Sequence, residues 1–163
     1  MTHQEALTVC AVVRPTELAG LRDRVAEVAA DPAGNALLPF GELAGVHFAR
    51  LMIVDGAPAG APGHWYLVLT IDCDAPGRRT LEQLVERSGA GLDELYGRCD
   101  GYPARPSPSA RLSYLRAHLE ASDVFYLHAV GRSLPQIRGE ARLRAAVEEC
   151  LDTHAERLAG RTP

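Results

Sequence analysis

The segment His64–Asp74, with the sequence HWYLVLTIDCD, decides the predicted fold. Side chains of a β-strand alternate between its two faces. One alternate set in this segment is wholly apolar and consists of Trp65, Leu67, Leu69 and Ile71. The other set is mixed and consists of Tyr66, Val68, Thr70 and Asp72. We therefore predict a strand whose apolar face lies under helices and whose mixed face is open, as in many antiparallel sheets.

A second strand is predicted over Val46–Asp55, because the intervening loop Gly56–Gly63 is rich in glycine and proline. The two strands then form an antiparallel hairpin. Alternation gives the second strand an apolar set of His47, Ala49, Leu51 and Ile53. Its mixed set is Val46, Phe48, Arg50, Met52 and Val54. A β-bulge or a slip of one residue would exchange the two faces.

The hairpin is preceded by one more strand and one helix. The apolar, valine-rich run Ala6–Arg14 predicts a strand. Thr16 is a suitable N-cap for the helix that follows. The apolar stripe of that helix consists of Leu18, Leu21, Val25 and Val28.

Two helical segments follow the hairpin. Thr80 and Gln83 have the spacing of a capping box and predict a helix start. We expect this helix to break at Ser88–Gly91 and to resume over Leu92–Cys99. A further short helix is predicted over Ala110–Ala121.

A fourth strand and a long last helix complete the predicted elements. The strand covers Asp123–Gly131, with Phe125, Leu127 and Ala129 on one face and Val124, Tyr126, His128 and Val130 on the other. Ser133 and Gln136 form a second capping box, and Pro135 fits the first turn of a helix. The apolar stripe of the last helix is Leu143, Val147, Cys150, Leu151, His154 and Leu158.

Without the additional helices, the element order is βαββαβ, which is the ferredoxin-like arrangement. We predict one α+β domain over residues 1–163, with a four-stranded antiparallel sheet and helices on one face. An additional helix precedes the fourth strand, and a long helix follows it. The other face of the sheet must be solvated, covered by a partner or hollowed into a pocket.

Composition narrows the range of functions. The chain has 163 residues, a net charge of −4 and no lysine, so we expect no nucleic-acid partner and no Schiff-base chemistry. No signal peptide or membrane span is recognised, so we expect a cytoplasmic protein with no membrane partner. The cysteines, Cys10, Cys73, Cys99 and Cys150, form no metal-binding spacing, and we expect reduced and mostly buried thiols and no metal site.

Polar side chains on the open face are the candidate catalytic groups. His128, with Asp72 or Tyr126 as partner, is a candidate general base. Arg50 or Arg132 would stabilise a developing oxyanion. The candidate substrate-binding residues are Tyr66, Tyr126, Thr70, Phe48 and Arg132. The alternative for His128 is a partly buried, hydrogen-bonded histidine in an interface.

Three other interpretations stay open. A haem cofactor is possible, with His47, His118 or His128 as ligand, although no spacing selects one of them. Gly131–Ser133 precedes a helix and suits an anion, or is an ordinary turn with a serine cap. Asp72 and Asp74 lie on the same side of their strand and suit a cation, or form a solvated strand end.

The element order and the polar residues on the open face resemble the ferredoxin-like, dimeric α/β-barrel superfamily. The segments HFARLMIVD and FYLHAVGRS are also similar to segments of uncharacterised actinobacterial domains, some of which are attached to peroxidase-like enzymes. The superfamily includes small monooxygenases of the quinol type, polyketide cyclases, dye-decolourising peroxidases and chlorite-dismutase-like proteins. The resemblance implies an open-face cavity and a homodimer. No catalytic motif of these families matches residue by residue, and a fold alone does not determine an activity.

Two functions are therefore expected. One is a small enzyme that acts on an apolar or aromatic small molecule through the open-face pocket, with oxidative or cyclase chemistry in secondary metabolism. The other is a non-catalytic ligand-binding or dimerisation module that serves another enzyme.

Overall fold

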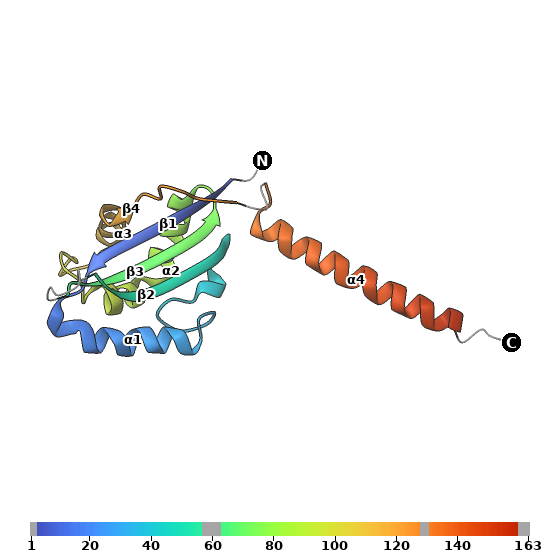
Figure 1. The fold of residues 1–163 in the computed structure, drawn as a ribbon, viewed down its shortest axis with the longest axis horizontal. Helices are drawn as coiled ribbons and strands as arrows, with labels where there is room; N and C mark the ends of the chain where they lie inside the picture. Colours follow the sequence, from blue (N-terminus) through green and yellow to red (C-terminus); the bar gives the residue numbers. More distant parts are fainter. Residues whose placement is uncertain (1–2, 57–62, 128–130, 160–163) are drawn as a thin grey trace.

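The computed structural model describes residues 3–56, 63–127 and 131–159, with side chains as far as residue 155 (Figure 1). Its strands are β1 (Gln4–Val12), β2 (Val46–Asp55), β3 (Trp65–Asp74) and β4 (Leu119–Glu120). Its helices are α1 (Leu18–Ala30), α2 (Gly77–Tyr96), α3 (Pro108–Ala117) and α4 (Leu134–Ala159), with short 3₁₀ turns at Pro15–Glu17 and Phe40–Glu42. The fold is α+β, as predicted.

The four strands form one antiparallel sheet in the order β2-β3-β1-β4. The central strand β3 pairs Leu69 with Val9 of β1 on one side and with Leu51 of β2 on the other. Leu69 and its neighbours Leu67 and Ile71 are almost fully buried, so the predicted apolar face is confirmed. Helices α1 and α2 pack against this face, and α3 packs on α2 (Figure 1).

The core consists of leucines from the sheet and from α2. Leu84 and Leu92 of α2 are completely buried with Leu67. The helix passes so close to the preceding loop that a Cβ atom on Gly91 would lie 1.9 Å from the carbonyl oxygen of Leu37. A glycine is therefore required at this contact, which explains why Gly91 lies inside a helix.

The predicted helix starts after β1 and β3 are wrong. Pro15 begins a 3₁₀ turn, so Glu17, and not Thr16, holds the N-cap position of α1. Helix α2 begins at Gly77, whose backbone N–H donates to a carboxylate oxygen of Glu5 at 2.8 Å. Since β1 satisfies this donor, no capping box forms at Thr80, which is buried.

Helix α2 also continues where a break was expected. The predicted interruption at Ser88–Gly91 is only a local distortion, with φ −118° and ψ 21° at Ser88. The side chain of Gln83, predicted as a cap, accepts a hydrogen bond from the backbone N–H of Ala44 at 3.0 Å. It therefore connects α2 to the loop before β2.

The fourth strand lies earlier than predicted. Strand β4 contains only Leu119 and Glu120, which pair with Val9 and Thr8 of β1. Residues 123–127 of the predicted strand are not in a strand, and Val124 is 86 % exposed. Strand propensity reflects packing against neighbours, and Tyr126 in the same segment is 77 % exposed. The face assignments predicted for residues 124–127 are therefore wrong.

Helix α4 begins as predicted and then leaves the sheet. Ser133 and Gln136 form the capping box: Ser133 N–H donates to the Gln136 side-chain oxygen at 2.8 Å, and Gln136 N–H donates to the Ser133 hydroxyl at 3.4 Å. The helix then extends away from the sheet (Figure 1), and every described side chain from Ala141 to Ala155 is exposed. Its apolar stripe therefore does not belong to the core.

Candidate functional site

A β-bulge at the start of β2 creates the candidate site. The register with β3 shifts between Val46, which pairs with Cys73, and Phe48, which pairs with Asp72. Val46 is consequently buried in the core, and Phe48 is exposed on the open face. His47 lies at the shift, and its side chain lines a cavity together with Phe48 and Asp72. The predicted assignment of Val46 to the open face and of His47 to the apolar face is therefore wrong.

His47 forms a buried polar pair with the last residue of β3. Its Nε2 lies 2.9 Å from Oδ1 of Asp74, and the two side chains are 8 % and 19 % exposed. The other carboxylate oxygen of Asp74 accepts a hydrogen bond from the backbone N–H of Leu134 at 3.2 Å. Asp74 thus connects the β2 bulge, the end of β3 and the first turn of α4.

The cavity beside His47 lies at the joint between the sheet and α4. Its volume is about 280 Å³, which is close to the lower limit for small-molecule sites. It is lined by Gln4, His47, Phe48, Asp72, Phe125, Tyr126, Leu127 and Ile137. The lining is mostly aromatic or aliphatic, with a few polar groups at one side, as is typical of sites that bind organic molecules.

The hydrogen bonds of Asp74 determine which nitrogen of His47 can react. The side-chain nitrogen of Gln4 lies 3.4 Å from Nε2 of His47, further away than Asp74 at 2.9 Å. An ionised carboxylate can only accept hydrogen bonds, so the shorter contact assigns the proton to Nε2, and Gln4 then donates nothing to this atom. Nδ1 of His47 makes no hydrogen bond to any residue in the described part of the chain. In the neutral ring, Nδ1 is then the proton acceptor of a side chain that lines the cavity, and Asp74 fixes this tautomer.

Three of the predicted site residues meet at this cavity: Phe48, Asp72 and Tyr126. His128, the predicted general base, lies outside the described residues. Arg50 and Thr70 pair with each other further along the open face, and Tyr66 lies beyond them on β3. These three residues and Arg132 are absent from the described cavity lining.

Arg132 makes two contacts at the start of α4. Its guanidinium lies 2.8 Å from a carboxylate oxygen of Glu140 in α4. Its backbone carbonyl accepts a hydrogen bond from the side-chain amide of Gln4 at 3.1 Å. Both contacts hold Arg132 at the start of α4, outside the described cavity lining, and its role at an oxyanion stays a prediction.

The start of α4 is the ordinary capped turn, and not the predicted anion site at Gly131–Ser133. The backbone N–H of Ser133 donates to Gln136, and that of Leu134 donates to Asp74. A carboxylate of the chain itself therefore occupies the place that a bound anion would take. Gly131 has φ +86°, a conformation that favours glycine at this turn. Asp74 is likewise engaged in these contacts and is not paired with Asp72 around a cation site.

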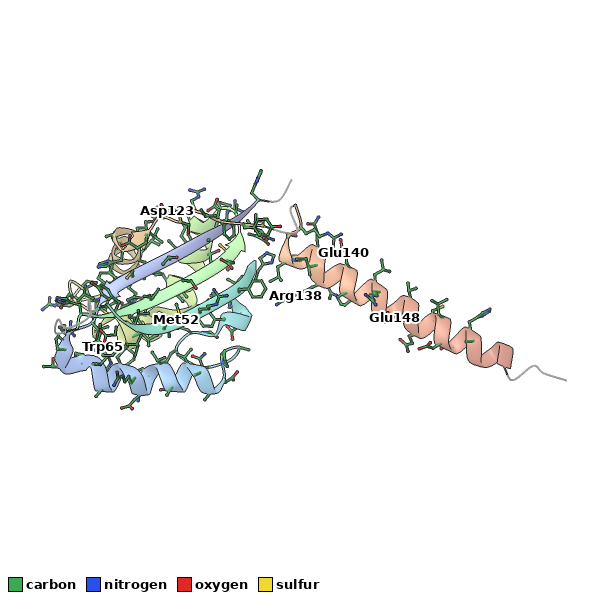
Figure 2. All side chains as sticks on the ribbon, in the orientation of Figure 1. Met52, Trp65, Asp123, Arg138, Glu140 and Glu148 are labelled. Carbon is green, nitrogen blue, oxygen red and sulfur yellow. The ribbon has the colours of Figure 1, made fainter. Side chains whose placement is uncertain are left out.

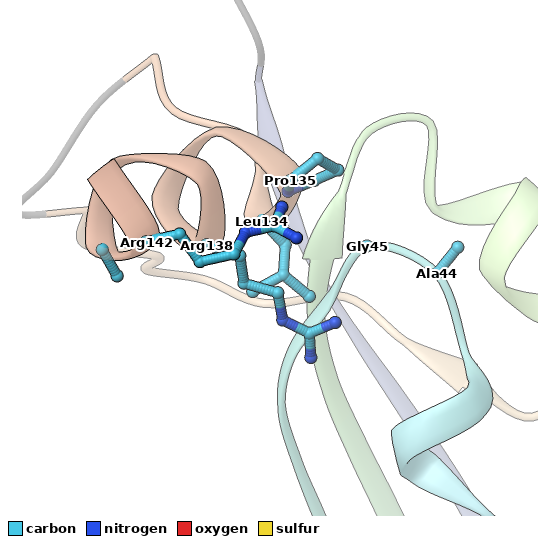
Figure 3. A pocket seen from close by; sticks show the side chains of 7 residues that line it. Ala44, Gly45, Leu134, Pro135, Arg138 and Arg142 are labelled. Carbon is cyan, nitrogen blue, oxygen red and sulfur yellow. The ribbon is translucent and has the colours of Figure 1, made fainter. Parts of the chain in front are cut away.

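A second cavity, of about 540 Å³, lies between the base of α4 and the loop before β2 (Figure 3). It is lined by Ala44, Gly45, Leu134, Pro135, Arg138, Ala141 and Arg142. Arg138 and Arg142 are exposed and extend from the same face of the helix (Figure 3). This cavity contains no group that is suited to proton transfer at neutral pH.

The histidines predicted as haem ligands have other contacts where they are described. His47 bonds Asp74, and Nδ1 of His118 lies 2.9 Å from the carbonyl oxygen of Tyr114. His118 also lies against the ring of Tyr114, with the ring centroids 4.0 Å apart. Within residues 3–56, 63–127 and 131–155, no group of three or more His, Cys, Asp or Glu side chains is arranged to hold a metal ion.

The cysteines differ in exposure. Cys73 and Cys99 are buried, and Cys10 is partly buried on the open face. Burial raises the pKa of Cys99 to about 12 and also raises the pKa of Cys73. Cys150 is exposed on α4, so the expectation of a buried thiol is wrong for this residue.

Comparison with known proteins found no matching family, no matching curated protein and no matching solved structure. Among the described helices, none combines the length and the apolar character that crossing a membrane requires.

Proposed function

We propose that the cavity at the β2 bulge binds a compact apolar or aromatic molecule and that His47 exchanges a proton with it. The observation that carries this proposal is the orientation of His47. One ring nitrogen is held by Asp74, and the side chain lines a cavity together with Phe48, Phe125 and Tyr126. A base held by a carboxylate in a mostly apolar site is a common arrangement in general acid–base catalysis.

Each residue has a defined role in this proposal. His47 removes a proton from a weakly acidic O–H or from a C–H next to a carbonyl group of the ligand. Asp74 holds the ring in one tautomer and stabilises the imidazolium that forms. The aromatic side chains contact the faces of the ligand, and Asp72 provides a polar group at the sheet side. Proton removal next to a carbonyl group is the first step of cyclase-like chemistry.

We also infer a ferredoxin-like arrangement for the sheet. The strand order β2-β3-β1-β4, with all neighbours antiparallel, supports this inference because it places β1 between β3 and β4. The element order βαββαβ of the described domain supports it as well. The resemblance to small monooxygenases and cyclases remains a hypothesis, as do haem binding, a homodimer and a cytoplasmic location.

One observation favours the alternative, a non-catalytic ligand-binding module. Asp74 also accepts a hydrogen bond from Leu134, so the His47–Asp74 pair holds the base of α4 as well as the histidine ring. In this alternative the cavity binds its ligand and His47 only contributes a hydrogen bond. The two functions differ in whether a proton is transferred.

The test uses 2-tetralone, a bicyclic aromatic ketone with an acidic C–H, in heavy water. Hydrogen exchange at its α-carbon is followed by NMR with and without the full-length protein. We expect the protein to accelerate exchange by about 10²-fold or more, which is the usual contribution of a general base. His47→Gln keeps a hydrogen-bonding side chain but cannot accept the proton, and it should remove the acceleration.

The matched control is His64→Gln, which makes the same substitution at an exposed histidine before β3. This variant should exchange the ketone like the wild type. Chemical-shift changes at Phe48 and Phe125 report binding separately from exchange. Binding without accelerated exchange would reject the catalytic role and favour the binding module, and an absence of both would reject the site.

A further inference from the structure

Helix α4 presents an apolar stripe that the described chain does not cover. Leu143, Val147 and Leu151 follow one another at intervals of four residues and are 66 %, 49 % and 63 % exposed. Each residue of an α-helix turns by about 100°, so these three side chains lie on one face. Cys150 and His154 extend the same face and are exposed too. A long helix of this kind owes most of its stability to packing of its apolar face.

The charges of α4 divide at the middle of this stripe. The half before Val147 carries three arginines and one glutamate: Arg138, Glu140, Arg142 and Arg144. From Val147 to Ala155, the charged side chains are all acidic: Glu148, Glu149 and Asp152. Figure 2 shows Arg138, Glu140 and Glu148 along the helix. This distribution is the reverse of the one that a helix's own dipole favours, so stability of the isolated helix does not explain it.

We propose that α4 pairs with α4 of a second copy of this chain, antiparallel and centred on Val147. A twofold axis through Val147 places Leu143 opposite Leu151 of the second copy, because the two residues are equally far from the centre. It also places Glu140 opposite His154 of the second copy, and the basic half of each helix beside the acidic half of the other. The apolar stripe of one helix thus matches the stripe of the other, and the basic half of each matches the acidic half of its partner, as a twofold interface requires.

The antiparallel orientation fits the charges better than the parallel one. A parallel pair in register would place each side chain opposite its own copy, so Glu140 would face Glu140 within the contact. Arg144, which lies 2.9 Å from Glu148 of its own helix, provides a further distinction. In the antiparallel pair, Arg144 and Glu148 lie on the same flank of the contact as Glu148 and Arg144 of the second copy. Along this flank the order is Arg144, Glu148 of the second copy, Glu148 and Arg144 of the second copy, so each arginine lies beside a glutamate of the other chain.

The first experiment measures the mass of the full chain by size-exclusion chromatography with light scattering over a dilution series. We expect a dimer that Val147→Asp converts to a monomer, because the substitution places two carboxylates at the centre of the contact. Ala145→Asp adds the same charge on the far side of the helix and should leave the dimer intact. A monomeric wild type overturns the proposal, and so does a dimer that Val147→Asp does not change, since another surface would then form it.

The second experiment determines the orientation. A parallel pair would place Cys150 against Cys150 of the second copy, whereas the antiparallel pair separates the two cysteines along the axis. Under mild oxidation we expect no disulfide-linked dimer from the wild-type chain. Val147→Cys in a Cys150→Ser background should form one readily. Efficient cross-linking of wild-type Cys150 would overturn the antiparallel orientation.

A charge exchange provides an independent check. Arg144→Glu and Glu148→Arg should each weaken the dimer at least several-fold, because each places like charges on one flank. The double variant again places opposite charges beside each other across the contact and should recover most of the dimer affinity. Circular dichroism of each variant measures the helix content. Equal dimer affinities for the wild type, the two single variants and the double variant would contradict the proposed contact. None of these results depends on ligand binding at His47.

Discussion

The contacts of Asp74 lead to a quantitative prediction for Asp74→Ala. The substitution removes the acceptor for Nε2 of His47 at 2.9 Å and for the Leu134 N–H at 3.2 Å. His47 is 8 % exposed, so water does not readily replace the lost partner. A hydrogen bond to a charged group contributes about 1.5–3 kcal/mol, and leaving a buried donor unsatisfied costs about 1–3 kcal/mol. We therefore expect the free energy of unfolding to fall by roughly 2–3 kcal/mol.

Urea denaturation monitored by fluorescence measures this loss, because Trp65 is the single tryptophan of the chain. Trp65 is partly buried at the edge of the sheet, where the guanidinium of Arg22 lies 4.9 Å from its ring centroid. With a slope near 2 kcal/mol per molar urea, the midpoint should fall by about 1 M with no change in slope. Hydrogen exchange at the Leu134 amide should also become faster, since this amide loses its acceptor.

The matched control is Asp72→Ala, two residues earlier on the same strand. The side chain of Asp72 makes no hydrogen bond to the described residues, so Asp72→Ala should lower the free energy of unfolding by less than about 0.5 kcal/mol. Asp74→Asn keeps one carbonyl oxygen, so its loss in the free energy of unfolding should lie between those of Asp74→Ala and Asp72→Ala. Equal unfolding midpoints for Asp74→Ala and Asp72→Ala would refute the reasoning, because the contacts of Asp74 would then contribute nothing to stability.

Two further predictions concern the rest of the domain. Hydrogen bonds from Arg111 and from Tyr102 lower the pKa of Asp93 in the folded protein. The Asp93–Arg111 pair therefore contributes its full stabilisation above the unfolded carboxyl pKa of about 4, and this stabilisation is lost as the pH falls through the lower pKa of the folded state. Acid titrations followed by circular dichroism should show a shallower loss of stability in Asp93→Asn than in the wild type, and identical slopes would contradict this. In the Val147→Asp variant, which we expect to be a monomer, a chromogenic aromatic disulfide should react quickly with exposed Cys150 but with Cys99 only after denaturation, because burial raises the Cys99 pKa to about 12. Rapid native labelling of Cys99 would show that this part of the core opens.

The sheet could be predicted where the alternation of side chains is regular. Leu67, Leu69 and Ile71 are buried because they lie on one face of β3, and the sequence alone determines that relation. The loop between β2 and β3 likewise indicated a hairpin. Regular alternation therefore identified the central strand β3 and the apolar face of the sheet.

The candidate site was missed because the alternation is interrupted. A regular β2 would place His47 in the core and leave both Val46 and Phe48 outside. The bulge resolves this conflict by burying Val46 and turning His47 toward Asp74. A polar residue at the head of an otherwise apolar set was a signal for the bulge. The partner Asp74 could not be inferred, because the pairing depends on the register across two strands.

The segments after α3 could not be predicted because their surroundings decide their structure. Aromatic and β-branched residues at 124–126 favoured a strand, but Val124 has no packing partner to stabilise one. The stripe of α4 was identified correctly as an apolar face. Periodicity shows that such a face exists, but it does not show whether the protein's own sheet or another molecule covers it.

Asp74 connects the two proposals physically. Its carboxylate bonds His47 at the cavity and Leu134 at the first turn of α4, and Ile137 of the same helix lines the cavity. A molecule bound there contacts the base of the helix whose outer face we propose as the dimer contact. If the dimer binds the ligand more tightly than the monomer does, the ligand must strengthen dimerisation by the same factor, because the two equilibria are linked. Repeating the dilution series with 2-tetralone measures this factor, and a factor of one would mean that the cavity and α4 act independently.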